Sequence, residues 1–366
     1  MQNITRPFLS VVVPTRDRGE WLDQCIDAIL RQSFTDFEVV IVDNDSNDDG
    51  KTKKVFEDKS KDSRLRYKRT GGLGMAANWQ VAVEEARGEY IVVCSDKLLL
   101  QNWLLESLGK LLAAGEFDAV VWQIGDYAKK SEKNIWSKQS IVYGEQIMSS
   151  AMSCSWRLLW NAGPRGMNSA IRNSLVSVVK EKLGVPICRM ICPDFSMALS
   201  LSALNCKILE TDIVGSVFLP NAHGNGMQAL LAKNNESLKG KFEFPELDCL
   251  PVKYLTAVTG IAYDILSTIK ITSRSESLKS FNWEGFYINL IHEAVNANQL
   301  GGFSEERTKE LIQAIASNSM RFRLSLFKTI IEQETTNLLR GRKSRKSQLV
   351  RMLNLLKFPF MGMMAK

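Results

Sequence analysis

The first hundred residues alternate short apolar runs with amphipathic segments, and this alternation limits the possible folds more than any other feature of the chain. Residues 8–13 and 37–42 are continuous apolar and β-branched runs, which is the pattern of strands buried on both faces. Residues 20–30 between them repeat apolar side chains at helical spacing. The same order continues with a strand pattern at 65–68, a helix pattern at 75–86 and a strand pattern at 90–94. The alternation predicts an α/β fold in which a mostly parallel sheet carries helices on both faces.

Beyond residue 100 the order is less regular, and it divides the chain into two units. Helices are predicted at about 102–114 and over CPDFSMALSLSAL, strands at about 119–123, 207–210 and 214–219, and a loop followed by a helix over NAGPRGMNSAIRNSLVSVV. From about residue 228 the pattern is helical to the end. A length of 366 residues also exceeds one ordinary core. We predict an α/β domain over 1–225, made of halves 1–100 and 101–225, and a helical region over 226–366.

The net charge of +7 comes from the C-terminal tail. Residues 340–366 hold eight Lys or Arg and no acid, which leaves 39 of the 47 basic residues against 40 acidic residues in the rest of the chain. A nucleic-acid partner is therefore not expected, because its groove needs clustered positive charge on the body of the protein. The tail joins five basic residues over 340–346 to an apolar face, which favours an interfacial helix on an anionic membrane surface. Packing of the tail on the helical region, with its charges solvated, is the alternative.

The cysteines and the apolar segments predict a cytoplasmic protein. Seven scattered cysteines include no CxxC pair, so reduced thiols are expected rather than a disulfide framework or a zinc site. The N-terminal residues lack the pattern of a signal peptide. The longest clean apolar stretch, about residues 254–263, is shorter than the roughly 20 residues that a membrane-spanning helix needs.

Acidic residues follow two of the predicted strands and open a later helix. Asp43 and Asp45 follow the second strand, Asp96 follows the strand that ends near residue 94, and Asp194 lies at the start of a predicted helix. Ligands of open α/β sheets bind beyond the carboxyl ends of the strands. Carboxylates that converge there suit ribose recognition, a divalent cation or a general base. A solvated turn rich in Asn and Asp over 43–50 is the alternative.

Two short segments resemble other binding motifs without completing them. DSNDDG resembles the start of a calcium-binding loop, but its twelfth position is Phe56 where a bidentate Glu is required, and a strand rather than a helix is expected to follow. TGGLGMAAN over 70–78 is Gly-rich before a helix, yet it is neither GxGxxG nor a Walker motif. Neither segment therefore predicts a calcium, dinucleotide or P-loop site.

Three longer segments carry a resemblance to a known family. They are SVVVPTRDRGEWLDQCIDAILRQSFTDFEVVIVDNDS, TGGLGMAANWQVAVEEARGEYIVVCSDKLLLQNWL and PDFSMALSLSAL. In this order they resemble the nucleotide-sugar-dependent family 2 glycosyltransferases of GT-A fold, over about residues 8–220. The resemblance implies an inverting transfer of a sugar from a nucleoside diphosphate sugar to the hydroxyl of a glycan, lipid-linked or polysaccharide acceptor.

The resemblance also implies roles for individual positions. Asp194 matches the general base that deprotonates the acceptor hydroxyl, and Asp96 stands in the DxD-like motif that holds a divalent cation, Mn²⁺ or Mg²⁺, against the diphosphate. Arg165 and Asn168 lie in WNAGPRGMNS, where the acceptor is expected. The residues expected to bind the nucleotide sugar are Pro14, Thr15, Arg16, Asp43, Asp45, Gly74, Asn78, Ser95, Asp96 and Lys97. His223, in a Gly-flanked loop after the last strand, is a second candidate for the metal, with a solvated surface His as the alternative.

The chain departs from the family pattern in VVCSDKLLL, where the family usually shows two or three acids. Asp96 is the only acid there, and Lys97 follows it directly. A metal ion would have one protein carboxylate, with diphosphate oxygens and water completing its shell. The Lys97 ammonium either faces the diphosphate and replaces part of the metal's charge, or points into solvent beside a working Asp96. The flexible stem of lysine favours the second arrangement.

Two other functions compete with sugar transfer. A sugar nucleotidyltransferase would share the sheet and the nucleotide, but it needs a Gly-rich first loop followed by an Arg and Lys pair, whereas the first loop here is TRDRG. A catalytically inactive relative that binds or scaffolds partners in a glycan-assembly pathway is the stronger alternative, because the acidic motif is reduced to one residue.

Overall fold

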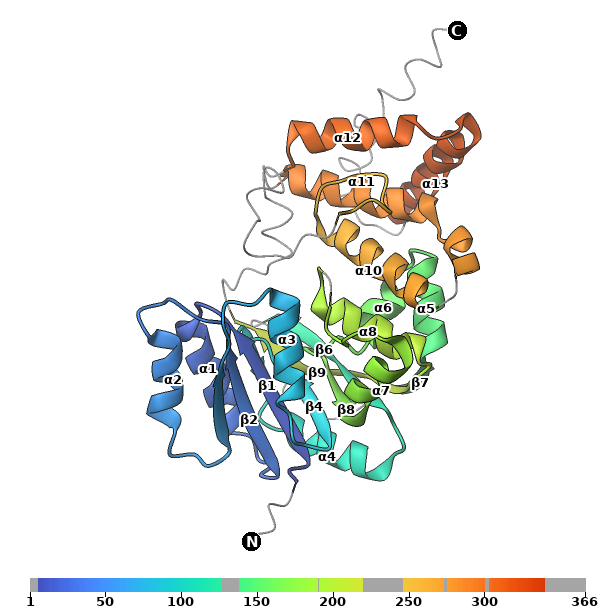
Figure 1. Cartoon of the computed structure of the whole chain (residues 1–366). Helices are drawn as coiled ribbons and strands as arrows, with labels where there is room; N and C mark the ends of the chain where they lie inside the picture. The colour runs from blue at the N-terminus through green and yellow to red at the C-terminus, as the bar shows by residue number, and fades with distance from the viewer. Residues whose placement is uncertain are drawn as a thin grey trace.

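The computed structural model of the chain describes residues 6–126, 138–189, 191–219, 246–272, 275–299 and 303–339. Its centre is one nine-stranded sheet with the spatial order β3-β2-β1-β4-β8-β6-β9-β5, in which β7 also pairs with β9 (Figure 1). The strands are β1 (Leu9–Thr15), β2 (Phe37–Asp43), β3 (Leu65–Arg69), β4 (Tyr90–Val93), β5 (Leu98–Leu100), β6 (Ala119–Asp126), β7 (Gln139–Tyr143), β8 (Ser169–Arg172) and β9 (Lys207–Phe218).

The four strands predicted in the first hundred residues lie side by side and are parallel. β2 pairs with β3 and β1, and β1 pairs with β4 on its other side. Thr15 at the end of β1 lies opposite Asp43 at the end of β2. The loops after β1, β2 and β4 therefore leave the sheet at one edge. The remaining pairs are antiparallel, except that β6 runs parallel to β9.

Side chains of β1 alternate between two apolar cores, one on each face of the sheet. Val11 and Val13 belong to the core that contains the buried side chains of α1 and α4, whereas Val12 belongs to the core that contains those of α3 and α8. This alternation follows from the two-residue period of a strand. The helices of this part of the chain are α1 (Gly19–Leu30), α2 (Lys51–Lys59), α3 (Met75–Glu84), α4 (Leu104–Ala114), α5 (Gly144–Met152), α6 (Arg157–Ala162), α7 (Ser174–Leu183) and α8 (Pro193–Ala203).

The C-terminal helices stack at one end of the molecule and extend one of the two cores (Figure 1). α10 packs against α8, and α11 packs against both α10 and α13. Buried side chains as far along the chain as Ile330 join the core that contains Val12. These elements are α10 (Ala257–Ile271), the 3₁₀ helix η3 (Ser275–Ser280), α11 (Trp283–Gln299), α12 (Glu305–Ala316) and α13 (Met320–Leu339). The predicted boundary near residue 225 and the tail over 340–366 lie outside the described residues.

The structure confirms the predicted α/β class, with a sheet covered on both faces and a helical C-terminal region. Three element predictions are wrong. The helix α2 follows DSNDDG, where the sequence predicts a strand. The strand β8 lies between the Gly/Pro loop and α7, where only a loop and a helix are predicted. The strands predicted at 207–210 and 214–219 form the single strand β9, whose pairing with β6 shifts register at two points.

Candidate functional site

Three loops meet where β1, β2 and β4 end, and they carry most of the predicted site residues. The loop after β2 is anchored by Asp43, which is buried. Its carboxylate accepts the Tyr67 hydroxyl at 2.6 Å on Oδ2 and the Ser46 backbone N–H at 3.0 Å on Oδ1. Burial, together with the bond to Asp43, raises the pKa of Tyr67 and keeps it a donor. The Asp43 carboxylate thus ties the backbone of the loop after β2 to the side chain of Tyr67 on β3.

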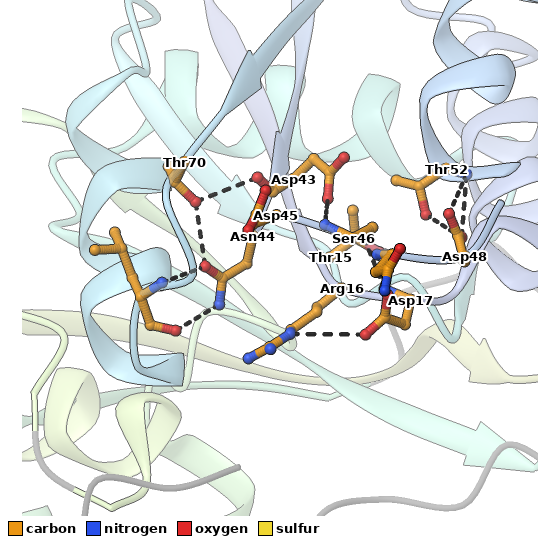
Figure 2. Close-up of polar contacts among 12 residues, drawn as sticks. Thr15, Arg16, Asp17, Asp43, Asn44, Asp45, Ser46, Asp48, Thr52 and Thr70 are labelled. Carbon is orange, nitrogen blue, oxygen red and sulfur yellow. Dashed lines mark hydrogen bonds and ion pairs between the residues drawn. The ribbon is translucent and has the colours of Figure 1, made fainter. Parts of the chain in front are cut away.

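Asn44 is the residue in this loop that sequence reasoning missed. Its side chain makes a reciprocal pair with Leu73, donating from Nδ2 to the carbonyl at 2.6 Å and accepting the N–H at 2.7 Å on Oδ1 (Figure 2). Thr70 donates to the backbone carbonyl of Asp43 and to Asn78 Oδ1 at 2.8 Å. The loop after β2 and the segment before α3 therefore form one hydrogen-bonded unit.

The predicted residues Gly74 and Asn78 belong to this unit. Gly74 precedes α3 and accepts the N–H of Asn78 at 3.0 Å. The Asn78 side chain is buried and contacts Thr70 and the Val42 carbonyl. These bonds use its amide for holding the loop, so contact with a diphosphate would have to come from the Gly74 backbone rather than from the Asn78 side chain.

The outer rim of the site is exposed and charged. Asp45 has a left-handed φ of 53° and accepts Arg69 Nη2 at 2.6 Å. Arg16 pairs loosely with Asp17, with Nε and Oδ2 at 3.7 Å, and the Asp17 carboxylate accepts the Asn47 N–H at 2.6 Å (Figure 2). Pro14 continues β1 below this rim. The rim side chains are open to solvent and can meet a ligand.

Asp48 in the same loop serves helix α2 rather than a ligand. Its carboxylate accepts the Thr52 hydroxyl at 2.6 Å and the Thr52 N–H (Figure 2). It also accepts the Gly19 N–H at 3.3 Å. Although burial opposes the shift, these bonds lower the pKa of Asp48. The residue fixes the starts of α1 and α2 against each other.

Asp96 lies at the centre of the site, and its carboxylate is enclosed by donors. The Thr15 hydroxyl donates to Oδ2 at 2.8 Å, and Arg18 Nη1 lies 3.2 Å from Oδ1. Ser95 Oγ is 3.4 Å from the same Oδ1. Burial raises the pKa of Asp96, against the opposing effect of Arg18, Thr15 and Lys97. Arg18, which sequence reasoning did not name, is therefore the cation directly paired with this acid.

Lys97 is buried, so the predicted arrangement with its ammonium in solvent is wrong. Only 8% of the residue is exposed. Burial and the nearby Arg18 lower its pKa, whereas Asp96 and Asp194 raise it. The charge of Lys97 therefore interacts with both carboxylates that the sequence singled out.

Asp194 begins the first turn of α8, directly after Pro193 at the first helical position. Its own backbone N–H and that of Phe195 bond to the carboxylate. Burial raises the pKa of Asp194, and the charges of Arg165 and Lys97 oppose that shift. A carboxylate with a raised pKa and few donors is suited to take a proton from a ligand hydroxyl.

Arg165 and Asn168 have different tasks in the loop before β8. The Arg165 guanidinium lies 4.6 Å from the Trp160 ring centroid and 5.4 Å from that of Phe195, beside Asp194. Asn168 is buried, accepts the Arg165 N–H at 3.1 Å and donates to the Gly163 carbonyl. Both of these side-chain hydrogen bonds lie within the loop, and this corrects the predicted contact of Asn168 with an acceptor.

Trp160 is the exposed aromatic residue of this group, with 44% of its surface accessible. Its ring meets Phe195 edge to face at 5.0 Å, and its carbonyl accepts Arg165 Nη2 at 3.1 Å. Trp160 is the first residue of the segment WNAGPRGMNS, but the sequence alone does not indicate that its side chain is exposed.

The residue Asp264, from the C-terminal region, reaches the base of this site. It lies on α10, is fully buried, and accepts the Cys192 N–H at 3.2 Å, two residues before Asp194. Arg189 on the same loop donates to Thr268 Oγ1 at 2.7 Å and to Ser200 Oγ. The start of α8 is therefore held by a helix some 70 residues further along the chain.

The described residues do not fit a divalent cation at the predicted place. Asp96 has both carboxylate oxygens engaged, and Arg18 and Lys97 crowd it with positive charge. Within the ranges that the structure describes, no three His, Cys, Asp or Glu side chains gather in an arrangement that could ligate a metal. His223 lies outside those ranges.

Comparison with known proteins gives consistent results. Residues 10–175 match the model of glycosyl transferase family 2. Glycosyltransferase GlyG of Streptococcus pneumoniae is 33% identical over 132 residues, which are 35% of this chain and 41% of that protein. A GalNAc(5)-diNAcBac-PP-undecaprenol beta-1,3-glucosyltransferase of Campylobacter jejuni is 33% identical over 105 residues, 28% of this chain and 33% of that protein. The matches thus span less than half the length of these relatives.

The solved structures that resemble this chain are more distant from it in sequence than these relatives are. The mannosyltransferase PcManGT from Pyrobaculum calidifontis in complex with GDP-Man and Mn²⁺ gives a TM-score of 0.49 at 16% identity, over 96% of this chain and 88% of that one. Residues 1–349 of TarS from S. aureus in complex with UDP-GlcNAc give 0.46 at 15% identity, over 83% and 84%. Among the helices that the structure describes, none is both long and apolar enough to span a membrane.

Proposed function

Residues 10–175 belong to glycosyl transferase family 2, and on this premise we propose that the protein is an inverting glycosyltransferase that uses a nucleoside diphosphate sugar. The sugar passes to a hydroxyl of a glycan, lipid-linked or polysaccharide acceptor. The observation that carries the proposal is the position of Asp194, a carboxylate with a raised pKa that shares its surroundings with Lys97 and Arg165. Family membership supplies the reaction class, and this carboxylate supplies a base for it.

In the proposed reaction Asp194 takes the proton of the acceptor hydroxyl as its oxygen attacks the anomeric carbon. A bond forms between that oxygen and the carbon, and the bond from the carbon to the diphosphate oxygen breaks. Its electron pair leaves with the diphosphate. Attack from the side opposite the leaving group inverts the configuration of the carbon.

The donor nucleotide is proposed to lie at the edge where β1, β2 and β4 end. The exposed rim offers Arg16 and Asp45, and the backbone of Pro14 and Gly74 borders the same edge. Thr15, Asp43 and Asn78 keep their roles beneath this surface, where their side chains hold the loops together. The acceptor is proposed to approach past Trp160 and Arg165 on the other side of Asp194.

The remaining expectations stay proposals. The resemblance implies Mn²⁺ or Mg²⁺, but the described donor set around Asp96 does not fit such an ion. An anionic membrane surface remains the proposed partner of the tail over 340–366. A catalytically inactive binding or scaffolding role is the second candidate function, and it is favoured by the single acid in VVCSDKLLL.

Sugar transfer by the Asp194→Asn variant tests the proposal. Once a screen of nucleotide sugars has identified the donor, we expect the variant to bind it as the wild type does and to lose about 10²-fold or more in kcat, which is typical of removing a general base. The exposed Glu181 on α7 gives the matched control, and Glu181→Gln should transfer normally. Equal turnover by Asp194→Asn and the wild type would refute the assignment, and donor binding without any turnover by the wild type would favour the inactive relative.

A further inference from the structure

Asp96 is closed to a metal ion by its own neighbours. The Thr15 hydroxyl is bonded to one carboxylate oxygen and the Arg18 guanidinium to the other, and the side chain is 1% exposed. A divalent cation at Asp96 would have to displace an arginine from a buried carboxylate and remain beside its charge. The position that would hold a metal already holds a protein cation.

Lys97 adds a second cation at the same place. It is buried, its charge interacts with those of Asp96 and Asp194, and its backbone carbonyl accepts the Leu219 N–H at 2.8 Å, which fixes the turn that carries it. With Arg165, whose charge acts on Asp194, three cations interact with the carboxylates of Asp96 and Asp194. The site is therefore short of negative charge before a donor binds.

A diphosphate is the ligand that this excess of positive charge suits. We infer that Arg18 and Lys97 bind the diphosphate of the donor in place of a divalent cation. The inference rests on the proposed function. As the bond between the anomeric carbon and the diphosphate breaks, its electron pair stays on the diphosphate oxygen, and the two held cations stabilise the charge that develops there. Asp96 is then a positioning residue that orients Arg18.

Burial makes the two cations effective for this task. The Lys97 stem is enclosed, so its ammonium gives up little conformational freedom when a phosphate arrives, and a charge in a site of low dielectric acts more strongly than one in water. The Arg18 side chain is 24% exposed, so it reaches the surface while one nitrogen stays on Asp96.

Calorimetric titration of the full chain with UDP, GDP, CDP and dTDP tests the inference, first in EDTA and then in Mn²⁺. We expect at least one of these nucleotides to bind in EDTA with an affinity within a few-fold of that in Mn²⁺. Binding that appears only with Mn²⁺ would overturn the inference and leave the proposed sugar transfer standing. Failure of all four to bind under either condition would overturn both.

Variants of Lys97 and Arg18 test whether these two side chains bind the diphosphate. In EDTA, Lys97→Met should weaken binding of the diphosphate about 10-fold or more, as loss of a charge-assisted contact predicts, and should weaken the matching nucleoside monophosphate much less. Arg18→Gln should act in the same direction, which guards against a folding defect in one variant. Lys110→Met, on an exposed lysine of α4, is the control and should bind normally. Equal losses for mono- and diphosphate, or no loss in either cation variant, would contradict the inference.

Discussion

Asp96 and Asp194 divide two tasks between them because their surroundings differ. Asp96 has a hydroxyl and a guanidinium on its two oxygens, so it is an anchor with little capacity for a ligand. The ionised form of Asp194 is favoured by the charge of Arg165, the backbone N–H groups of its own helix turn and the charge of Lys97. Burial raises the pKa of both carboxyls, and the proposed function assigns the proton transfer to Asp194.

The pH dependence of transfer follows from the shifted pKa of Asp194. A general base must be ionised, so kcat/KM should fall as the pH drops through the pKa of Asp194 in the free enzyme, which is raised from 3.8. We expect the acid limb of the profile above that ordinary value. Lys97 favours the ionised carboxylate, so Lys97→Met should move the limb to still higher pH. Profiles over pH 4 to 8 check this, and a limb in Lys97→Met that coincides with that of the control Lys110→Met would contradict it.

The local sequence predicted which strand ends carry polar side chains, but it could not predict the pairings. Asp43, Asp96 and Lys97 were found because they follow apolar runs. The bonds that decide the role of Asp96 come from Thr15 and Arg18, some 80 residues earlier, and depend on β1 lying beside β4. The burial of Lys97 depends on the same neighbours, so a rule about flexible lysine stems gave the wrong orientation.

At the level of secondary structure, the segments without a clear period were the ones predicted wrongly. α2 is KTKKVFEDK, whose only buried residues are Thr52 and Val55, so it shows no apolar stripe. Its start is fixed by Asp48 through contacts with Thr52 and Gly19, which a sequence pattern does not display. β8 has four residues between a loop and a helix, too few for an alternation to be recognised.

The loop between α6 and β8 owes its shape to Gly166. This residue has a φ of +72°, and an added Cβ would lie 3.1 Å from Val93 Cβ and 3.3 Å from Met197 Sδ. The loop carries Arg165, and the two contacts come from β4 and α8. A larger side chain at residue 166 would therefore push against β4 and α8.

Gly166→Ala should destabilise the protein by more than the matched change Gly184→Ala. Gly184 after α7 has a φ of +68° with nothing within 4 Å of an added Cβ, so that variant loses only about 1–2 kcal/mol for its left-handed backbone. Gly166→Ala has the same backbone strain plus overpacking, which adds about 1–3 kcal/mol. Denaturant unfolding measures both free energies, and similar losses in the two variants would show that the loop can shift to accept the methyl group.

On the scale of the whole molecule, the C-terminal helices are part of the site's support. α10 contributes Asp264 to the loop that precedes α8, and the two regions share a core. The sequence predicted a helical region but gave no reason to connect it with Asp194, because α10 itself reads as an ordinary buried helix. Buried groups that pair across two regions of a chain are invisible to any pattern of local spacing.

Asp264 provides a test of this connection. Asp264→Ala leaves the part-buried Cys192 N–H without its acceptor, so we expect a loss of about 1–3 kcal/mol in unfolding free energy. Transfer should fall because Asp194 loses its support, while donor binding at the ends of β1, β2 and β4 stays unchanged. Asp264→Asn keeps an acceptor of the same shape and should restore both stability and transfer. Asp248→Ala, at an exposed acid before α10, is the control.

The sign of the pH dependence separates this role from a buried ion pair. Burial raises the pKa of Asp264 well above 3.8 in the folded chain, despite the opposing charge of Arg189, so the folded state holds its proton more tightly than the unfolded state. The stability that this difference contributes is present at low pH and is lost as the pH rises from 3.8 through the folded pKa. Asp264→Asn has no such proton to lose, so its stability relative to the wild type should increase with pH across that window. If the wild type instead gains on Asp264→Asn as the pH rises, the carboxylate is stabilised by Arg189 as an ion pair, and α10 supports Asp194 through that charge rather than through a neutral hydrogen bond.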